Sequence, residues 1–233
     1  IRGCGMRKGD RTEEAVAGCL SKWAGKMLYL CGFWRFANAY LAKHRKVKIM
    51  IDNRNISIVQ DSDGKYIVII NDRKLRGDSK DDWKIVEEYL KGFIWDHYEI
   101  IDTAEAVYIG TEFPSEYSGS KSRLALKGAR RKAKALAAQG IPEMIRFAEN
   151  PRWEENRENK HRKDAKYGWY RYDVRFGIPV YAERTKYIER YNVFKAILLV
   201  KHAEDDKKYL HDLITIKTVS YTHLRAHETT LHL

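Results

Sequence analysis

Alternation of apolar and polar residues dominates the last third of the chain. The alternating runs are rich in β-branched and aromatic residues, which indicates β-strands at 169–181, 191–202 and 209–218. Short turns separate these strands, so we expect an antiparallel meander of three to four strands. In the first strand, Tyr172 and Phe176 share one face, while Arg171 and Arg175 share the other. The pattern therefore predicts a sheet with one apolar face and one cationic face.

Helical periodicity precedes the meander. A polar turn before Ser120 and an apolar stripe beyond it predict one long helix from about Ser120 to Ala138. Gly140 ends this helix, and Pro142 begins a shorter one. Basic side chains at helical spacing share another face of the long helix: Arg123, Lys127, Arg130 and Lys134. This basic stripe either binds phosphates or is a solvated face.

Residues 55–113 have the pattern of a small ββαββ unit. Two β-branched runs flank the turn Asp61-Ser62-Asp63-Gly64, which predicts a hairpin. A helix capped by Asp81 or Asp82 follows, and two short strands meet around Asp102-Thr103. No catalytic constellation appears here, which favours a scaffold or docking unit.

The remaining segments differ in character. Residues 1–52 are basic and helical, and they are either a nucleic-acid-binding or interfacial helix or the end of a truncated preceding domain. Residues 152–166 are expected to be a hydrophilic linker. Residues 219–233 resemble translated sequencing-adapter read-through. This tail is excluded from functional argument, although its histidines imitate a zinc site.

These patterns together predict an α+β fold. The ββαββ unit at 55–113 is followed, after Phe113-Pro114, by a helix-plus-meander domain at 114–218. The apolar face of the meander lies under the helices, and its other face is exposed.

Composition narrows the range of partners. The net charge of +12 favours an anionic partner, with nucleic acid first and an anionic membrane surface second. No apolar run approaches the roughly 18 residues of a spanning helix. Three widely spaced cysteines form neither a disulfide framework nor a metal knuckle, which favours a reducing, cytoplasmic setting.

The exposed face of the meander carries the candidate chemistry. Strand alternation assigns the following residues to it, with His161 and Lys166 at its edge: Arg171, Asp173, Arg175, Lys195, His211 and Thr215. Trp169 and Tyr170 are candidates for stacking on unpaired bases. For each of these a structural role stays open: a solvated histidine, an aspartate that pairs with an arginine across strands, or aromatic residues in the core.

This set of residues suits RNA cleavage without a metal or cofactor. The 2′-hydroxyl of RNA attacks the adjacent phosphate, and a histidine with an ordinary pKa near ~6.5 can move either proton. Arginine and lysine stabilise the charge that develops on the phosphate, by roughly 3–4 kcal/mol for each well-placed donor in comparable sites. The predicted catalytic residues are His161, Lys166, Arg171, Arg175 and His211. The predicted nucleic-acid-binding residues are Arg123, Lys127, Arg130, Lys134, Trp169, Tyr170 and Lys195.

The segment Ala165-Lys166-Tyr167-Gly168-Trp169-Tyr170-Arg171-Tyr172 is the most specific part of a resemblance that covers about residues 55–218. The chain resembles the large polyvalent protein-associated domain 3 group of phages and conjugative elements. That resemblance implies a nuclease fold of the barnase–EndoU–colicin–RelE type, an origin in a mobile element and an activity on RNA. The matching positions are His161, Lys166, Trp169, Tyr170, Arg171 and Arg175.

Three hypotheses follow from the sequence. The leading one is a metal-independent endoribonuclease domain whose partner is RNA, with an immunity or partner protein as a further expectation and no membrane insertion. The second is a non-catalytic nucleic-acid-binding module on the same fold. The third is a phage structural protein whose basic surface binds packaged DNA.

Overall fold

The computed structural model describes residues 54–157, 164–182 and 187–219. All of these residues belong to the second of two units of the chain, Val47–Leu233. The helical segment predicted at 1–52 lies outside the described residues, as do His161 and all of the predicted tail except Val219.

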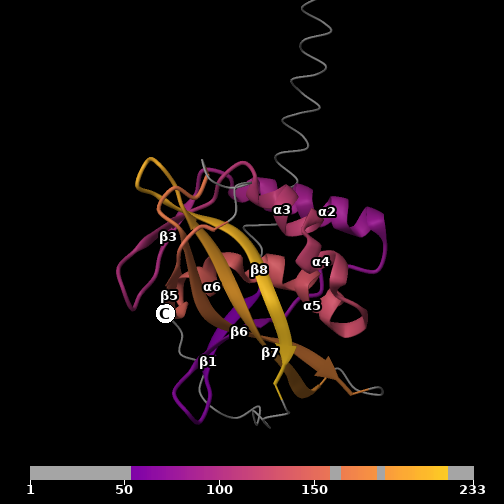
Figure 1. The fold of residues 1–233 in the computed structure, drawn as a ribbon. Coiled ribbons are helices and arrows are strands. Elements are labelled where there is room, and N and C mark those ends of the chain that lie inside the picture. Colours follow the sequence, from indigo (N-terminus) through magenta and orange to yellow (C-terminus); the bar gives the residue numbers. More distant parts are fainter. Residues whose placement is uncertain (1–53, 158–163, 183–186, 220–233) are drawn as a thin grey trace, which may run out of the picture. The chain divides into compact units, whose positions relative to one another are not determined.

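The described residues form an α+β fold built on one mixed sheet (Figure 1). The strands run in the order β1-β2-β6-β7-β8-β4-β3, and β5 pairs with β6 beside this path. Strands from both sides of Phe113-Pro114 thus join the same sheet. Their bounds are β1 Ile56–Gln60, β2 Tyr66–Ile70, β3 His97–Glu99, β4 Ala106–Tyr108, β5 Glu149–Glu154, β6 Trp169–Tyr181, β7 Ile188–His202 and β8 Lys208–Thr218.

The predicted C-terminal meander is confirmed. Strands β6, β7 and β8 pair antiparallel in sequence order. The inward side chains Tyr172, Val174 and Phe176 are buried, which is the alternation expected of a sheet with one covered face. The predicted β1–β2 hairpin is also confirmed: the Asp61 carboxylate accepts from the backbone N–H groups of Asp63 and Lys65, and Gly64 has a φ of 72°.

Strand β8 departs from the predicted alternation. Its register with β7 shifts between Leu199 and Val200 and again between Lys195 and Ile197. At the second shift, β8 has one residue more than β7. Thr215 lies there with a φ of 56°. Strict alternation with His211 and Thr215 on the exposed face would expose Leu213 and bury Ile214. The bulges instead bury Leu213 fully and leave Ile214 only half-buried, so the predicted alternation is wrong at this point.

The helices cover the apolar face of the sheet and share its core (Figure 1). Helix α2 does not begin with an aspartate cap. Ser79 caps it instead, and the backbone N–H of Ser79 donates to Asp82 in return. The helical elements are α2 Lys80–Leu90, η1 Lys91–Phe93, α3 Phe113–Gly119, α4 Lys121–Ala125, α5 Gly128–Ala137, η2 Ala138–Gly140 and α6 Ile141–Arg146.

The single helix predicted from Ser120 to Ala138 is wrong. Ser120 is extended and caps α4, and Leu126 and Lys127 are again extended. Gly128 then has a φ of 55°, a conformation that glycine adopts with little strain. The chain therefore turns twice where the sequence periodicity continues.

The linker predicted at 152–166 is also wrong in its first part. Residues Glu149–Glu154 form β5, which pairs antiparallel with the start of β6. Gly168 permits this close approach: its φ is 95°, and a Cβ there would lie 2.6 Å from the carbonyl oxygen of Glu154. Strand β5 thereby adds a wall beside the exposed face of the meander.

Candidate nucleic-acid interface

The predicted cationic face is divided between two cavities. The first, here the tryptophan cavity, has a volume of about 730 Å³. The second, here the lysine cavity, has a volume of about 350 Å³. Arg171 and His211 line the tryptophan cavity with Trp153, Glu154 and Trp169. Arg175, Lys195, Asp173 and Thr215 line the lysine cavity.

Local hydrogen bonds fix the wall of the tryptophan cavity. The indole N–H of Trp153 donates to the carbonyl oxygen of Tyr167 at 2.9 Å. The Asn156 amide donates to the carbonyl oxygen of Ala165 at 3.2 Å. These contacts hold the end of β5 against the turn that leads into β6. The side chain of Trp153 is nevertheless 57% exposed, so its indole faces solvent.

Arg171 is the cation that this wall positions. Its guanidinium lies 2.8 Å from the Glu154 carboxylate, and the hydrogen bond from Arg171 lowers the pKa of Glu154. The Nε of Arg171 is buried and has no hydrogen-bond partner among the described residues. The side chain as a whole is 30% exposed, so it is the terminal nitrogens of the guanidinium that a ligand can reach.

His211 reaches the same cavity from β8. It lies at the first register shift of that strand and packs edge-to-face against Trp169, with ring centroids 5.1 Å apart. Its Nε2 is 3.9 Å from a carboxylate oxygen of Glu116. The structure therefore brings together His211, Trp169 and Arg171, which the sequence also placed together.

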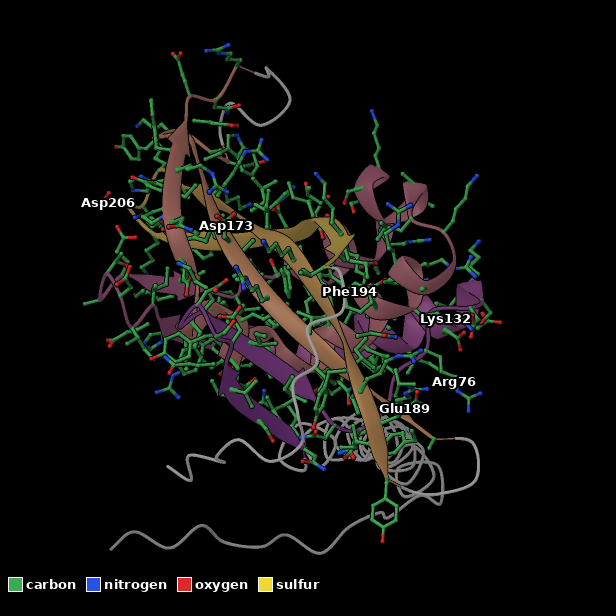
Figure 2. The ribbon with its side chains drawn as sticks, turned by 90° about the horizontal axis from the view of Figure 1, so that it is seen from below. Arg76, Lys132, Asp173, Glu189, Phe194 and Asp206 are labelled. Atoms are coloured by element: carbon green, nitrogen blue, oxygen red, sulfur yellow. The ribbon has the colours of Figure 1, made fainter. Side chains whose placement is uncertain are left out.

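Asp173 is held by β5 rather than by a neighbour in the meander. Arg152 donates to both of its carboxylate oxygens, at 2.8 and 2.6 Å, and the Asn150 amide donates at 3.1 Å. The hydrogen bond from Arg152 lowers the pKa of Asp173. The expected pairing of this aspartate with an arginine is confirmed, and Figure 2 shows Asp173 on the long strands.

The other predicted catalytic cations lie elsewhere. Lys166 pairs with Glu204 at 2.8 Å and does not line the tryptophan cavity. Arg175 pairs with Asp61 of the β1–β2 turn and lines the lysine cavity. Of the four predicted catalytic residues that the structure describes, only Arg171 and His211 therefore line the tryptophan cavity.

The predicted basic stripe does not exist as one face. Arg123 stacks on Trp83, with its guanidinium carbon 4.8 Å from the ring centroid, and donates to the carbonyl oxygen of Ser118. Lys127 and Arg130 are exposed. Lys134 is fully buried, so its predicted contact with nucleic acid is wrong. The break before Gly128 separates Arg123 from the residues of α5, whereas Lys134 is buried because it faces Asp212 of β8.

Lys134 instead belongs to a buried charge network. Its Nζ lies 2.6 Å from Asp212, and burial lowers the pKa of Lys134. The same carboxylate accepts from Ser120 at 2.8 Å and Ser122 at 2.6 Å, and from the backbone N–H of Leu213 at 2.7 Å. This network ties helices α4 and α5 to β8. An aspartate among the apolar positions of β8 was its sequence signal.

Tyr170 is also placed differently from the prediction. Its ring packs against the core, stacks near Tyr172, and lies 3.9 Å from the Nζ of Lys208. It is therefore not on the face that carries the tryptophan cavity, whereas Trp169 lines that cavity. Sequence reasoning missed Trp153, Glu154 and Arg157 because their charged segment was taken as a linker.

Comparisons with protein-family models, with curated proteins and with solved structures found no match. Within the described residues, no three His, Cys, Asp or Glu side chains are grouped so that they could hold a metal ion. None of the described helices is long and apolar enough to cross a membrane.

Proposed function

We propose that this protein is an endoribonuclease that cleaves single-stranded RNA without a metal, at the tryptophan cavity. One observation carries the proposal: a single cavity contains a histidine, an arginine paired with a carboxylate, and two tryptophans. These are the groups needed to move protons, stabilise a phosphate and hold unpaired bases.

The proposed reaction uses the nucleophile of the substrate. Glu154 takes the proton of the 2′-hydroxyl as its oxygen bonds to phosphorus. His211 protonates the 5′-oxygen as the bond from phosphorus to that oxygen breaks, which leaves a cyclic phosphate and a 5′-hydroxyl. A glutamate carboxylate is ionised near neutral pH, so Glu154 can accept this proton. His211 acts as the acid in its protonated imidazolium form.

Arg171 binds the phosphate in this proposal. Its pair with Glu154 is partly exposed, with side-chain exposures of 30% and 53%. A phosphate can therefore displace the carboxylate from the guanidinium, and this exchange frees Glu154 to act as the base. Arginine suits this role because its planar fork binds two oxygens at once.

The tryptophans supply affinity for unpaired bases. Trp153 is exposed beside Trp169 at the rim of the cavity, and stacking of a base on an aromatic ring contributes about 1–3 kcal/mol. The resemblance to the large polyvalent protein-associated domain 3 group supports an RNA substrate. By the same resemblance, we propose a barnase–EndoU–colicin–RelE type of fold, a mobile-element origin, action in the cytoplasm of a bacterial host, and restraint by a partner protein.

The requirement for a 2′-hydroxyl in the substrate provides the most direct test of the proposed reaction. The wild-type protein is incubated in EDTA with single-stranded RNA and with DNA of the same sequence. We expect cleavage of the RNA only, with 2′,3′-cyclic phosphate and 5′-hydroxyl ends identified by mass spectrometry. Equal cleavage of the DNA, or a requirement for added divalent metal, would overturn the proposed reaction.

A second candidate function is nucleic-acid binding without cleavage. It is favoured by the finding that Lys166, Arg171 and Arg175 each already pair with a carboxylate. This candidate predicts salt-sensitive binding of RNA and no cleaved ends in the same experiment.

A further inference from the structure

The lysine cavity contains a row of like charges across three strands. In the β6–β7 register Arg175 lies directly opposite Lys195, and in the β7–β8 register Lys195 lies directly opposite Lys217. All three side chains line the same cavity. We call these three residues the cation row.

Such a row is unfavourable in the unliganded sheet. Side chains directly opposite in an antiparallel pair have Cβ atoms about 4.5–5.5 Å apart, and like charges at this distance repel. Arg175 has one compensating partner, Asp61. The Asp173 carboxylate is hydrogen-bonded by Arg152, which is the main cause of its lowered pKa, with Lys195 a weaker one. The ammonium group of Lys217 has no hydrogen bond or ion pair with the residues that the structure describes.

The backbone of β8 is distorted at the point where the row is completed. The register shift between Lys195 and Ile197 includes Thr215, a β-branched residue with a φ of 56°. This conformation is strained for threonine, and such strain gathers at ligand-binding sites. The shift brings Lys217 into register with Lys195, so the strained residue and the unfavourable charge row belong to one feature.

The wall of the lysine cavity adds an aromatic surface. Tyr66 lines the cavity and is 38% exposed, and its ring centroid is 4.7 Å from that of Phe147. The Asn150 side chain lines the same wall. Aromatic rings beside clustered cations are the combination that binds single-stranded nucleic acid, because bases stack while phosphates pair.

We propose that the cation row binds the phosphate backbone of a single strand at a site separate from the tryptophan cavity. Arg171 and Arg175 are four residues apart on β6, which places their Cα atoms about 13 Å apart along the strand. One phosphate does not span that distance, so the two cavities hold different phosphates of the same strand. The choice of RNA as ligand rests on the proposed function, whereas the anionic nature of the ligand rests on the cation row itself.

The test uses an oligonucleotide that the proposed reaction does not cleave. A fluorescein-labelled RNA with methylated 2′-hydroxyls is titrated at several salt concentrations, and binding is followed by anisotropy. For Lys195→Gln/Lys217→Gln we expect affinity at low salt to fall at least about tenfold. The slope of log K against log salt should become shallower by about 1.4, since each phosphate contact on a single strand contributes about 0.7.

A matched control distinguishes the loss of this site from a general loss of positive charge. Lys80→Gln/Lys121→Gln removes the same charge from two exposed lysines at the starts of α2 and α4, outside both cavities. The control should bind like the wild type. Equal loss in the control, or an unchanged slope in Lys195→Gln/Lys217→Gln, overturns the site. Equally tight binding of a duplex overturns its preference for a single strand.

Stability provides a second measurement. Removal of like charges should raise the melting temperature of Lys195→Gln/Lys217→Gln or leave it unchanged, whereas a clear fall would contradict the repulsion argued for the row. The two proposals fail separately. If the double variant shows the expected shallower slope but the wild type cleaves no RNA, the proposed reaction alone is wrong. Cleavage with an unchanged slope in the double variant overturns the cation row alone.

Discussion

Two charge pairs with the same shortest distance differ in almost everything else. Lys134 and Asp212 approach to 2.6 Å with side chains that are 0% and 3% exposed. Arg152 and Asp173 also approach to 2.6 Å, but their side chains are 45% and 43% exposed. Geometry alone therefore does not distinguish a structural pair from one that can yield to a ligand, whereas burial does.

Burial decides which pair can exchange its partner. The Lys134–Asp212 pair is surrounded by donors from Ser120, Ser122 and the backbone of Leu213, so no ligand replaces either charge. On the exposed face, water already competes for each ion, and a phosphate can take the place of a carboxylate on Arg171. The charge pair on the helix side of the sheet is therefore closed to solvent, whereas the ion pairs on the opposite side are in contact with solvent.

The largest expected change in the free energy of unfolding comes from breaking the buried Lys134–Asp212 pair. Lys134→Met should lower the free energy of unfolding by about 3–5 kcal/mol, because it leaves the Asp212 charge buried without its cation. Urea denaturation at neutral pH measures the difference. The double variant Lys134→Met/Asp212→Leu should recover a large part of this loss. A single variant as stable as the wild type would contradict the structural role of the network.

A smaller loss is expected from the wall of the tryptophan cavity. Gly168→Ala places a Cβ against the backbone of Glu154 at a positive φ, and strained backbone of this kind costs about 1–3 kcal/mol. The control is Gly119→Ala at the end of α3, where an added Cβ meets nothing within 4 Å. Thermal melts of both variants test the comparison. Equal melting temperatures would show that the approach of β5 to β6 does not depend on Gly168.

The exposed Arg152–Asp173 pair should contribute least to the free energy of unfolding. Arg152→Gln should change the free energy of unfolding by at most about 1 kcal/mol, the usual range for an ion pair in contact with solvent. A loss as large as that of Lys134→Met would contradict the distinction between the two regions. Urea denaturation under the same conditions makes the two variants directly comparable.

The contribution of the Arg152–Asp173 pair to stability should depend on pH. The pKa of Asp173 is lowered in the folded protein by Arg152, so its contribution to stability is present above the unfolded value near ~3.9. It is lost as the pH falls below that value through the lowered pKa. The difference in melting temperature between wild type and Arg152→Gln should therefore be constant near neutral pH and vanish in strong acid. A difference that grows in acid would contradict this assignment.

The meander was predictable because period-two alternation records which side chains face the core. Tyr172, Val174 and Phe176 show this directly. The bulges in β8 were not predictable, since the extra residue at Thr215 has no marker in a sequence that continues to alternate. The break before Gly128 was hidden for a similar reason: the helical pattern persists across it.

The site was only partly predictable from the sequence. Arg171, Trp169 and His211 were placed together because they alternate correctly on β6 and β8. Trp153 and Glu154 were missed because β5 is recognisable only from its pairing with β6, and its charged residues are typical of a linker. Lys134 was misassigned because helical spacing identifies a face but not which face is buried. His161 stays a prediction, since it lies outside the described residues.

The most direct test of the central claim is the rate of RNA cleavage by His211→Ala in EDTA. His97→Ala is the control, because His97 lies on β3 outside the tryptophan cavity. With folding verified by circular dichroism, His211→Ala should cleave about 10²–10⁴-fold more slowly than wild type, while His97→Ala should match it. Cleavage by His211→Ala at the wild-type rate would contradict the assignment of the tryptophan cavity as the active site.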